Sequence, residues 1–353
     1  MKPLRVLLTA DPYIPVPPRL YGGIERVVDS LVRGLHARGH LVTLVAHPAS
    51  RTPGRLIPYG APPHFGLTPR ATELWQAGSA LWAHRSQVDL VHSFGRLAAL
   101  VPLLPLRRLP KIQSYHRPEV PWRSVAIASA LAGASLSFTS CSASMFRRRP
   151  PGASQASGRW RAIFNGIALS RYRFVEAVPI DAPLVFLGKI EPMKGVHDAI
   201  AIAKTAERRL VIAGTRAEGG PDAEYFEREI APYIDGGQVT FVGPVDDTQK
   251  SDLLGGACAL VFPTHWEETF GLVMVEAMAC GTPVIGFARG AVPEVVQEGV
   301  NGYLCRSVEE AVAAVKRLDL IDRRAVRADC EARFSDSDMV SAYESLYLDM
   351  VER

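Results

Sequence analysis

The amino-acid sequence predicts an α/β fold made of two doubly wound, Rossmann-like domains that face each other across a cleft. Two observations carry this prediction. Short apolar runs alternate with amphipathic helical patterns in both halves of the chain, and such alternation favours parallel sheets covered by helices. The chain has 353 residues, of which 48% are hydrophobic, so each half is long enough to enclose its own core.

The first half opens with an apolar strand at residues 4–9, followed by a proline-rich loop and a helix. Apolar residues recur at helical spacing from Ile24 to Leu35, and Gly39 ends this helix. Four further strands are expected at 41–46, 88–93, 111–115 and 135–140, and a strand with a turn at 162–167.

Two loop-like stretches separate the halves. The composition changes to RRRPPGASQAS at 147–157, and a proline-bearing stretch lies at 177–183. We therefore predict an N-terminal domain over residues 1–172 and a C-terminal domain over 173–334. The last residues, 335–353, have helical periodicity and are expected to form a helix that crosses back to the N-terminal domain.

The second half repeats the alternation more clearly. Its strands are expected at 184–188, 209–214, 238–243, 258–263 and 282–287. Its helices are expected at 196–207, 222–232, 246–254 and 271–280.

No segment of the sequence has the length and composition of a membrane span. The longest apolar run, 97–106, contains two prolines and is about half as long as a bilayer requires. The five cysteines include no C-x-x-C pair, so buried reduced thiols are expected rather than disulfides or zinc ligands. We expect a cytoplasmic protein, peripheral at the inner face of the membrane if it meets one.

Charge is divided unevenly along the chain. Residues 1–175 carry 23 Lys and Arg against 6 Asp and Glu, a net charge of +17, whereas residues 176–353 carry 17 against 30, a net charge of −13. The basic half is suited to an anionic acceptor or an anionic membrane surface. A preference for arginine that happens to fall on one half is the alternative. We expect no nucleic-acid partner.

The segment HWEETFGLVMVEAMACGTPVI, residues 265–285, carries the strongest chemical signal. A strand ends before it and a helix begins near Gly271, so Glu268 lies at the junction and Glu276 about two helical turns further on. A carboxylate in this position can accept hydrogen bonds from a vicinal diol. Glycine allows close approach of a ligand to the backbone, and the helix N-terminus favours a phosphate.

This segment resembles the Glu-x7-Glu motif of retaining GT-B glycosyltransferases of glycosyltransferase family 4. The resemblance extends over most of the second half and more loosely over the first. It implies that Glu276 holds the ribose of a nucleotide-sugar and that Glu268 contacts the donor hexose. It further implies that the residues between them line the sugar (Thr269, Phe270 and Gly271) or present amides to the diphosphate (Leu272 and Val273). Glu267 is out of register and is left out.

A second segment, FLGKIEPMKGVHDAI, places Gly188, Lys189 and Lys194 between a strand and a helix. Two cations at such a junction suit a diphosphate. The family shows an arginine and a lysine here, and Lys189 replaces the arginine, which removes a bidentate phosphate contact.

The first half resembles the family in its glycine loop, Gly22 and Gly23, which implies a place under the donor phosphates and next to the acceptor. His116 follows an expected strand, and the resemblance implies that it contacts the transferred sugar. His92 is a weaker candidate of the same kind. Residues 241–243, ending in Gly243, resemble the loop beside the nucleobase, and residues 213–215 are a second candidate wall.

The resemblance assigns catalytic roles to His116, Glu268 and Lys194 in transfer of a hexose with retention of configuration. We expect the donor to be a uridine diphosphate sugar acting as co-substrate, with no cofactor and no metal site. Asp246 and Asp247 head a helix and are better explained as its cap. No carboxylate nucleophile is assignable, so the resemblance favours front-face displacement.

Rival functions remain open at this point. A sugar-nucleotide epimerase would convert the donor without an acceptor, and a non-catalytic nucleotide-sugar-binding protein would need the same carboxylates and lysines. A phosphorylase would need a cofactor-bearing lysine site, which the sequence does not offer. A dinucleotide dehydrogenase is disfavoured, because no G-x-G-x-x-G follows the first strand.

Overall fold

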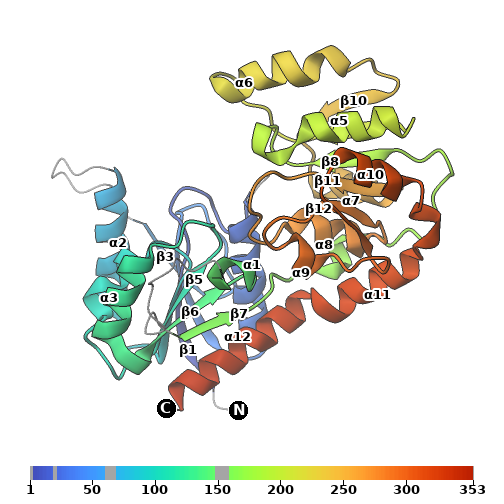
Figure 1. Ribbon diagram of the computed structural model, residues 1–353. Helices are drawn as coiled ribbons and strands as arrows, with labels where there is room; N and C mark the ends of the chain where they lie inside the picture. The colour runs from blue at the N-terminus through green and yellow to red at the C-terminus, as the bar shows by residue number, and fades with distance from the viewer. Residues whose placement is uncertain (1–2, 19–21, 60–68, 148–158, 353) are drawn as a thin grey trace. The chain divides into compact units, whose positions relative to one another are not determined.

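A computed structural model of the chain describes residues 3–18, 22–59, 69–147 and 159–352. The chain divides into two compact units, and Figure 1 shows that each has a central sheet flanked by helices. Unit 1 comprises Met1–Gly166 together with Asp336–Arg353, and unit 2 comprises Ile167–Ser335. The final helix is therefore part of the first unit. Arg148 and Arg149, in the arginine-rich loop, lie outside the described residues.

Unit 1 is built on a parallel sheet of seven strands in the order β3-β2-β1-β4-β5-β6-β7. The order reverses between β1 and β4, as in a doubly wound fold. The strands are β1 (Arg5–Thr9), β2 (Leu41–Ala46), β3 (Arg55–Pro58), β4 (Leu90–Ser93), β5 (Lys111–Tyr115), β6 (Leu136–Ser140) and β7 (Arg159–Ala162).

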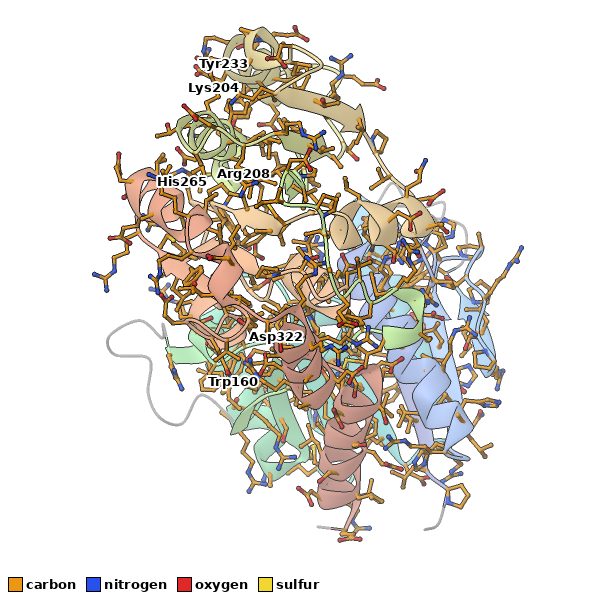
Figure 2. All side chains as sticks on the ribbon, turned by 90° about the vertical axis from the view of Figure 1, so that its right-hand side faces the viewer. Trp160, Lys204, Arg208, Tyr233, His265 and Asp322 are labelled. Atoms are coloured by element: carbon orange, nitrogen blue, oxygen red, sulfur yellow. The ribbon has the colours of Figure 1, made fainter. Side chains whose placement is uncertain are left out.

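The longer helices of unit 1 cover this sheet (Figure 1). They are α1 (Gly23–Ala37), α2 (Pro69–His84), α3 (Trp122–Ala132), α4 (Ser144–Arg147) and α12 (Asp336–Val351), with 3-10 turns η1 (Leu97–Leu103) and η2 (Gly133–Ser135). Strand β7 is held at the sheet's edge by Trp160, which Figure 2 labels. The indole stacks on Phe138 at a centroid distance of 5.1 Å and on Tyr115 at 5.6 Å.

The C-terminal helix α12 is packed into the core of unit 1. Gly34 of α1 leaves no room for a larger residue, because a Cβ there would lie 2.4 Å from Val340 Cγ2. His92 on β4 is fully buried, and its two ring nitrogens lie 2.6 Å from the hydroxyls of Tyr347 and Ser114. His92 is thus a satisfied core residue, and burial holds its pKa well below the usual value.

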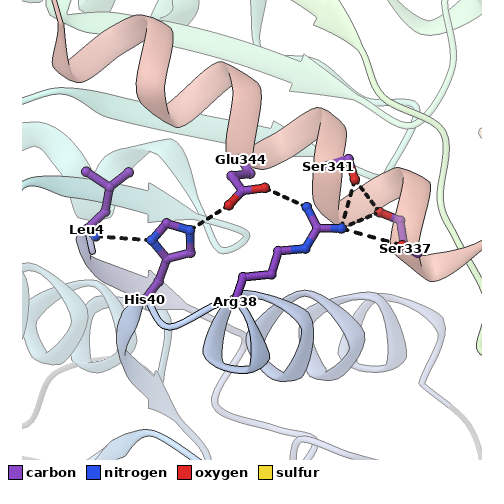
Figure 3. A network of polar contacts seen from close by, with 6 residues as sticks. All are labelled: Leu4, Arg38, His40, Ser337, Ser341 and Glu344. Carbon is purple, nitrogen blue, oxygen red and sulfur yellow. Dashed lines mark hydrogen bonds and ion pairs between the residues drawn. The ribbon is translucent and has the colours of Figure 1, made fainter. Parts of the chain in front are cut away.

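A second polar network fastens the same helix at its outer side (Figure 3). Glu344 accepts a hydrogen bond from Arg38 at 2.5 Å and lies 2.8 Å from His40 Nε2, while His40 Nδ1 accepts from the Leu4 amide at 3.1 Å. Burial opposes ionisation of Glu344. The hydrogen bonds from His40 and Arg38 outweigh it and lower the pKa of Glu344 below its usual value.

Unit 2 is built on a parallel sheet of six strands in the order β10-β9-β8-β11-β12-β13. Here the order reverses between β8 and β11. The strands are β8 (Leu184–Leu187), β9 (Leu210–Ala213), β10 (Val239–Gly243), β11 (Ala259–Phe262), β12 (Val284–Phe287) and β13 (Gly302–Cys305).

The helices of unit 2 follow its strands in alternation. They are α5 (Val196–Thr205), α6 (Pro221–Tyr225), α7 (Asp247–Gly255), α8 (Leu272–Ala279), α9 (Val292–Val295), α10 (Val308–Val315) and α11 (Arg323–Arg333). Short 3-10 turns are η3 (Leu169–Arg171), η4 (Pro192–Lys194), η6 (Ala231–Tyr233) and η7 (Leu318–Leu320). A π-helical turn, η5 (Phe226–Ile230), directly follows α6.

The predicted α/β fold of two Rossmann-like units is confirmed, and its strands differ from the prediction in two respects. The strand expected at 162–167 was placed too late, since β7 ends at Ala162 and the turn begins there. Strands β3 and β13 were not predicted, because neither is a continuous apolar run. All five cysteines are free thiols, as expected, and only Cys258 is partly exposed. Within the described part of the chain, every helix is too short or too polar to span a bilayer.

We predict that Glu344→Gln lowers the free energy of unfolding by about 1 kcal/mol at pH 7, since charge-assisted hydrogen bonds to Arg38 and His40 are lost at a partly exposed site. A carboxylate with a lowered pKa stabilises the fold above its unfolded pKa of about 4.3. The difference from the wild type should therefore shrink as the pH falls below about 4.3, and it should vanish once the pH is below the lowered pKa of Glu344 in the folded protein.

Denaturant unfolding across this pH range measures the effect. Asp349→Asn is the matched control. Asp349 lies on the same helix as Glu344 and pairs with Arg161 of β7, and both side chains of that pair are nearly half exposed. Equal losses in the two variants, or a loss that persists in acid, would contradict the role given to Glu344.

Candidate active site

The carboxyl ends of β8 and β11 meet at the point where the strand order of unit 2 reverses. Ligands of doubly wound sheets bind at such a switch point. The loop after β8 carries Lys189 and Lys194, and the loop after β11 carries Glu268 and leads into α8. The topology therefore brings the two segments singled out in the sequence to one edge of the sheet.

The loop after β8 approaches β11 closely enough to require glycine. Gly195 has a φ of +73°, and a Cβ there would lie 2.0 Å from the carbonyl oxygen of Pro263. This contact sets the position of Lys194, the preceding residue, in turn η4. Lys189 lies earlier in the loop and forms an ion pair with Glu191 at 3.5 Å.

Glu268 and Lys194 form an ion pair across the switch point. Lys194 Nζ donates to Glu268 Oε2 at 2.8 Å, and the two side chains are 26% and 10% exposed. The second carboxylate oxygen accepts from the amide of Thr269 at 3.2 Å. Two of the three residues to which we assigned catalytic roles are thus in direct contact, at the place where a ligand of this fold binds.

The backbone of Glu268 rests against the loop that follows β12. The Ala291 amide donates to the Glu268 carbonyl at 2.8 Å. Gly290 has a φ of +57°, and a Cβ on it would lie 2.2 Å from the same oxygen. Glu267, which was left out of the predicted pair, points to this loop and lies 3.9 Å from Arg289.

The helix α8 begins directly after this junction. Gly271 has a φ of +80° and a Cβ there would lie 2.6 Å from Met274 Cε, so a side chain would be both strained and crowded. Phe270 is buried and packs edge-to-face on Phe334 at 5.8 Å. Leu272 and Val273 occupy the first turn, where amide groups and the helix dipole favour an anion.

Glu276 lies deeper along α8 and is 6% exposed. Its Oε1 atom accepts hydrogen bonds from Lys250 Nζ at 2.6 Å and from the Tyr172 hydroxyl at 2.7 Å. Its Oε2 atom has no hydrogen-bond partner among the described residues and keeps its acceptor capacity. The pairing leaves one carboxylate oxygen of Glu276 available to a ligand.

Three glycines line up at the ends of neighbouring strands on the other side of the switch point. A Cβ on Gly214, after β9, would lie 1.7 Å from the carbonyl oxygen of Gly188, and the Gly214 amide donates to the Gly243 carbonyl at 2.8 Å. The candidate wall for the nucleobase at 213–215 thus adjoins the end of β8, and the wall at 241–243 adjoins the end of β9.

The site residues expected in the first half belong to unit 1. His116 follows β5 at the carboxyl edge of that sheet and packs on Phe94 with ring centroids 5.4 Å apart. Burial lowers the pKa of His116 to about 4, because it disfavours the imidazolium form. The side chain is therefore neutral at physiological pH.

The glycine loop of unit 1 leads into α1. Gly22 has a φ of +152°, and a Cβ there would lie 2.7 Å from Pro18 Cβ and 2.9 Å from Glu25 Oε2. Gly23 is the first residue of the helix. Glu25 is buried, and desolvation raises its pKa. At the same edge Arg117 pairs with Asp11 at 3.3 Å.

The expected cap of α7 is confirmed. Asp246 accepts from the Gln249 amide at 2.9 Å, and the Gln249 side chain accepts from the Asp246 amide at 3.0 Å. These acidic residues therefore start a helix. Lys250 and Tyr172, which hold Glu276, and Gly290 were not found from the sequence, because each lies outside the recognisable motifs.

Comparisons with known proteins identify the family of the chain. Residues 21–171 match the family described as Glycosyltransferase Family 4, and residues 173–333 match Glycosyl transferases group 1. Glycogen synthase of Mycobacterium tuberculosis is 30% identical over an alignment that covers 98% of this chain and 94% of that protein. D-inositol 3-phosphate glycosyltransferase of Mycobacterium leprae is 35% identical over 36% of this chain and 30% of its own length.

Solved structures show the same fold. Sucrose-phosphate synthase from Thermosynechococcus elongatus has a TM-score of 0.79 at 22% identity and covers 98% of this chain and 99% of its own. HepE of Anabaena, in complex with UDP and glucose, has a TM-score of 0.72 at 19% identity, with coverages of 98% and 100%. Two Rossmann-like units together with the two family matches define a GT-B glycosyltransferase. The chain belongs to glycosyltransferase family 4, whose members are retaining and metal-independent enzymes.

We predict that Gly290→Ala displaces Glu268 and weakens binding of a nucleotide-sugar, because the new Cβ meets the Glu268 backbone. Gly299→Ala is the matched control. Gly299 has a similar φ of +75°, yet nothing lies within 4 Å of its Cβ position. Both variants share a backbone strain of about 1–2 kcal/mol. Only Gly290→Ala should lose more than this from the free energy of unfolding, and only Gly290→Ala should bind the nucleotide-sugar more weakly. Calorimetric titration with UDP-glucose and thermal melts measure both quantities, and indistinguishable variants would contradict the prediction.

Proposed function

We propose that this protein transfers a hexose from a uridine diphosphate sugar to an acceptor hydroxyl, with retention of anomeric configuration. The Lys194–Glu268 pair at the switch point of unit 2 is the observation that supports it most directly. The cation is placed to meet the diphosphate, and the carboxylate is placed to accept hydrogen bonds from hexose hydroxyls.

The surrounding groups fit the charge that develops as the sugar leaves. The departing diphosphate gains negative charge, which Lys194, Lys189 and the amides of Leu272 and Val273 would stabilise. Thr269, Phe270 and Gly271 would lie along the sugar, and Glu276 Oε2 would accept from the ribose. Gly188 and Gly243 would border the nucleobase, where short side chains leave the backbone accessible.

The residues of unit 1 would also contact the donor and would lie next to the acceptor. His116 would contact the transferred sugar as a neutral hydrogen-bonding group, since its pKa lies near 4. Gly22 and Gly23 would let the α1 N-terminus approach the donor phosphates. Because no carboxylate is assignable as a nucleophile, we favour front-face displacement, in which the leaving phosphate assists the incoming hydroxyl.

The relatives support a glucose-like donor without fixing the acceptor. The relative with matching length is a glycogen synthase, which supports a glucosyl donor and a glucan acceptor as the first pair to test. The HepE structures hold UDP-glucose or its parts, whereas a starch synthase of the same fold is bound to ADP. Uridine and adenine donors therefore belong in the same experiment.

A mass-spectrometric screen tests the proposal. Each of UDP-glucose, ADP-glucose and other nucleotide-sugars is incubated with a glucan, with inositol phosphate or with no acceptor. An acceptor heavier by one hexose, dependent on a uridine donor, is the expected result. Conversion of the donor to its epimer without acceptor would favour an epimerase, and an unchanged donor that still binds would favour a binding protein. Either result would overturn the proposal.

Glu276→Ala is predicted to weaken UDP binding by roughly tenfold to a hundredfold, because the ribose loses a charged acceptor worth about 1.5–3 kcal/mol. The variant also leaves the buried ammonium of Lys250 with only Asp247, at 3.5 Å, as an acidic partner among the described residues. Glu276→Ala with Lys250→Met removes both charges and is the stability control. Calorimetry should show weak UDP binding in both variants, and wild-type affinity in the folded double variant would exclude Glu276 from the site.

The basic half is proposed to engage an anionic membrane surface. Arg85, Arg107 and Arg108 line a depression of about 600 Å³ in unit 1, beside the residues that precede β4 and β5. This is the amino edge of the sheet, opposite the strand ends that carry His116. Arginines near an anionic bilayer contribute about 1 kcal/mol each, and salt screens the attraction beyond roughly 10 Å.

Vesicle co-sedimentation tests this surface. We expect binding to vesicles containing phosphatidylserine but not to neutral vesicles, lost at high salt and reduced by Arg107→Ala with Arg108→Ala. A matched control is Arg208→Ala with Arg209→Ala, two partly exposed arginines of unit 2. Equal, salt-insensitive binding to both vesicle types would overturn membrane docking. It would leave a soluble anionic acceptor, attraction between the two oppositely charged domains, or a mere preference for arginine as the explanation of the charge division.

A further inference from the structure

Three potential metal ligands converge beside the donor loops of unit 2. His197 and Asp198 lie in the first turn of α5, and His265 lies in the loop after β11. One ligand atom from each residue lies within 4.8 Å of the other two. His265 Nε2 is 2.6 Å from Asp198 Oδ2, and His197 Nε2 is 3.8 Å from Asp198 Oδ1.

The neighbours of this cluster orient the two imidazoles. The Tyr225 hydroxyl lies 2.8 Å from His197 Nδ1 and accepts from the His197 amide at 3.2 Å, so the ring presents Nε2 to Asp198. The rings of His197 and His265 are stacked with an angle of 2° between them. Phe287 packs edge-on against His265. Figure 2 labels His265 in unit 2.

The geometry points to a site for Zn²⁺ formed by His197 Nε2, His265 Nε2 and Asp198. Two imidazoles and a carboxylate, with a fourth position left to water, are a ligand set typical of zinc. Ligand atoms of a tetrahedral zinc ion are about 3.3 Å apart, and the separations of 2.6 and 3.8 Å lie on either side of this value. A hydrogen bond from an outer partner to the second nitrogen of a ligating histidine, as Tyr225 offers, is also typical of metal sites.

A metal here would join the two loops that carry the donor site. The His265 amide donates to the Met193 carbonyl at 2.9 Å, and Met193 precedes Lys194. His265 itself lies three residues before Glu268. The ion would cross-link these loops a short distance from the Lys194–Glu268 pair. Because the enzymes of this family are metal-independent, its role would be to hold the loops, not to take part in transfer.

Zinc binding to the full-length protein, freed of metal with a chelator, tests the proposal without any donor or acceptor. Isothermal titration with Zn²⁺ should show one equivalent bound and a higher melting temperature. Loss of a residue that only hydrogen-bonds to a metal ligand weakens metal binding by about tenfold or more. His197→Ala and His265→Ala remove ligands and should each weaken zinc binding by more than about tenfold. Tyr225→Phe removes only the partner of His197 and should weaken it less. His36→Ala, on the exposed side of α1, should bind as the wild type does.

The outcomes are decisive in either direction. The site is supported if both histidine variants lose zinc binding while His36→Ala keeps it. All three variants must have the melting temperature of the wild type in the absence of metal. No binding by the wild type, or binding retained in both histidine variants, overturns it and leaves a hydrogen-bonded start of α5. His265→Gln, which keeps a polar side chain, replaces His265→Ala if that variant does not fold. Donor transfer before and after chelation is measured separately and should not change, so failure of the zinc site and failure of the proposed activity are distinguishable.

Discussion

Close contact between backbone segments is the constraint on which the donor site depends. Gly195 lies against the Pro263 carbonyl, Gly214 against Gly188, and Gly290 against Glu268, each at a distance that excludes a Cβ. These contacts bring the loops after β8, β9, β11 and β12 together at one edge of the sheet. Only then can a lysine from one loop meet a glutamate from another at hydrogen-bond distance. The charged side chains supply the chemistry, but glycine makes their meeting possible.

The two carboxylates of the motif are held in different ways, although they are eight residues apart on one segment. Glu268 is positioned through its backbone, and its side chain forms an ion pair with a lysine from a loop. Glu276 is positioned through its side chain, by an ammonium from α7 and a hydroxyl from the segment before β8. The first arrangement ties Glu268 to the loops after β8 and β12, and the second holds Glu276 Oε1 between α7 and the segment before β8.

Much of this could be predicted from the sequence, because parallel strands that are buried on both faces are continuous apolar runs. Lys194, Glu268 and Glu276 were found because they belong to segments with a recognisable order of residues. The supporting residues were not found, since Lys250 resembles an ordinary surface lysine of a helix and Gly290 an ordinary turn glycine. His92 and His116 both occur at strand ends, and only the structure shows that the first is saturated by Tyr347 and Ser114.

The place of the final helix has a consequence for how the chain is made. Unit 2 is one continuous stretch of sequence and can complete its sheet as soon as it leaves the ribosome. Most of unit 1 is synthesised first, yet the buried ring of His92 lacks its Tyr347 partner until residue 347 has been synthesised. A nascent unit 1 therefore lacks the helix that packs against α1 throughout translation of unit 2. Unit 1 is therefore begun first and completed last. While unit 2 is being synthesised, the incomplete unit 1 is most exposed to aggregation and to binding by a chaperone.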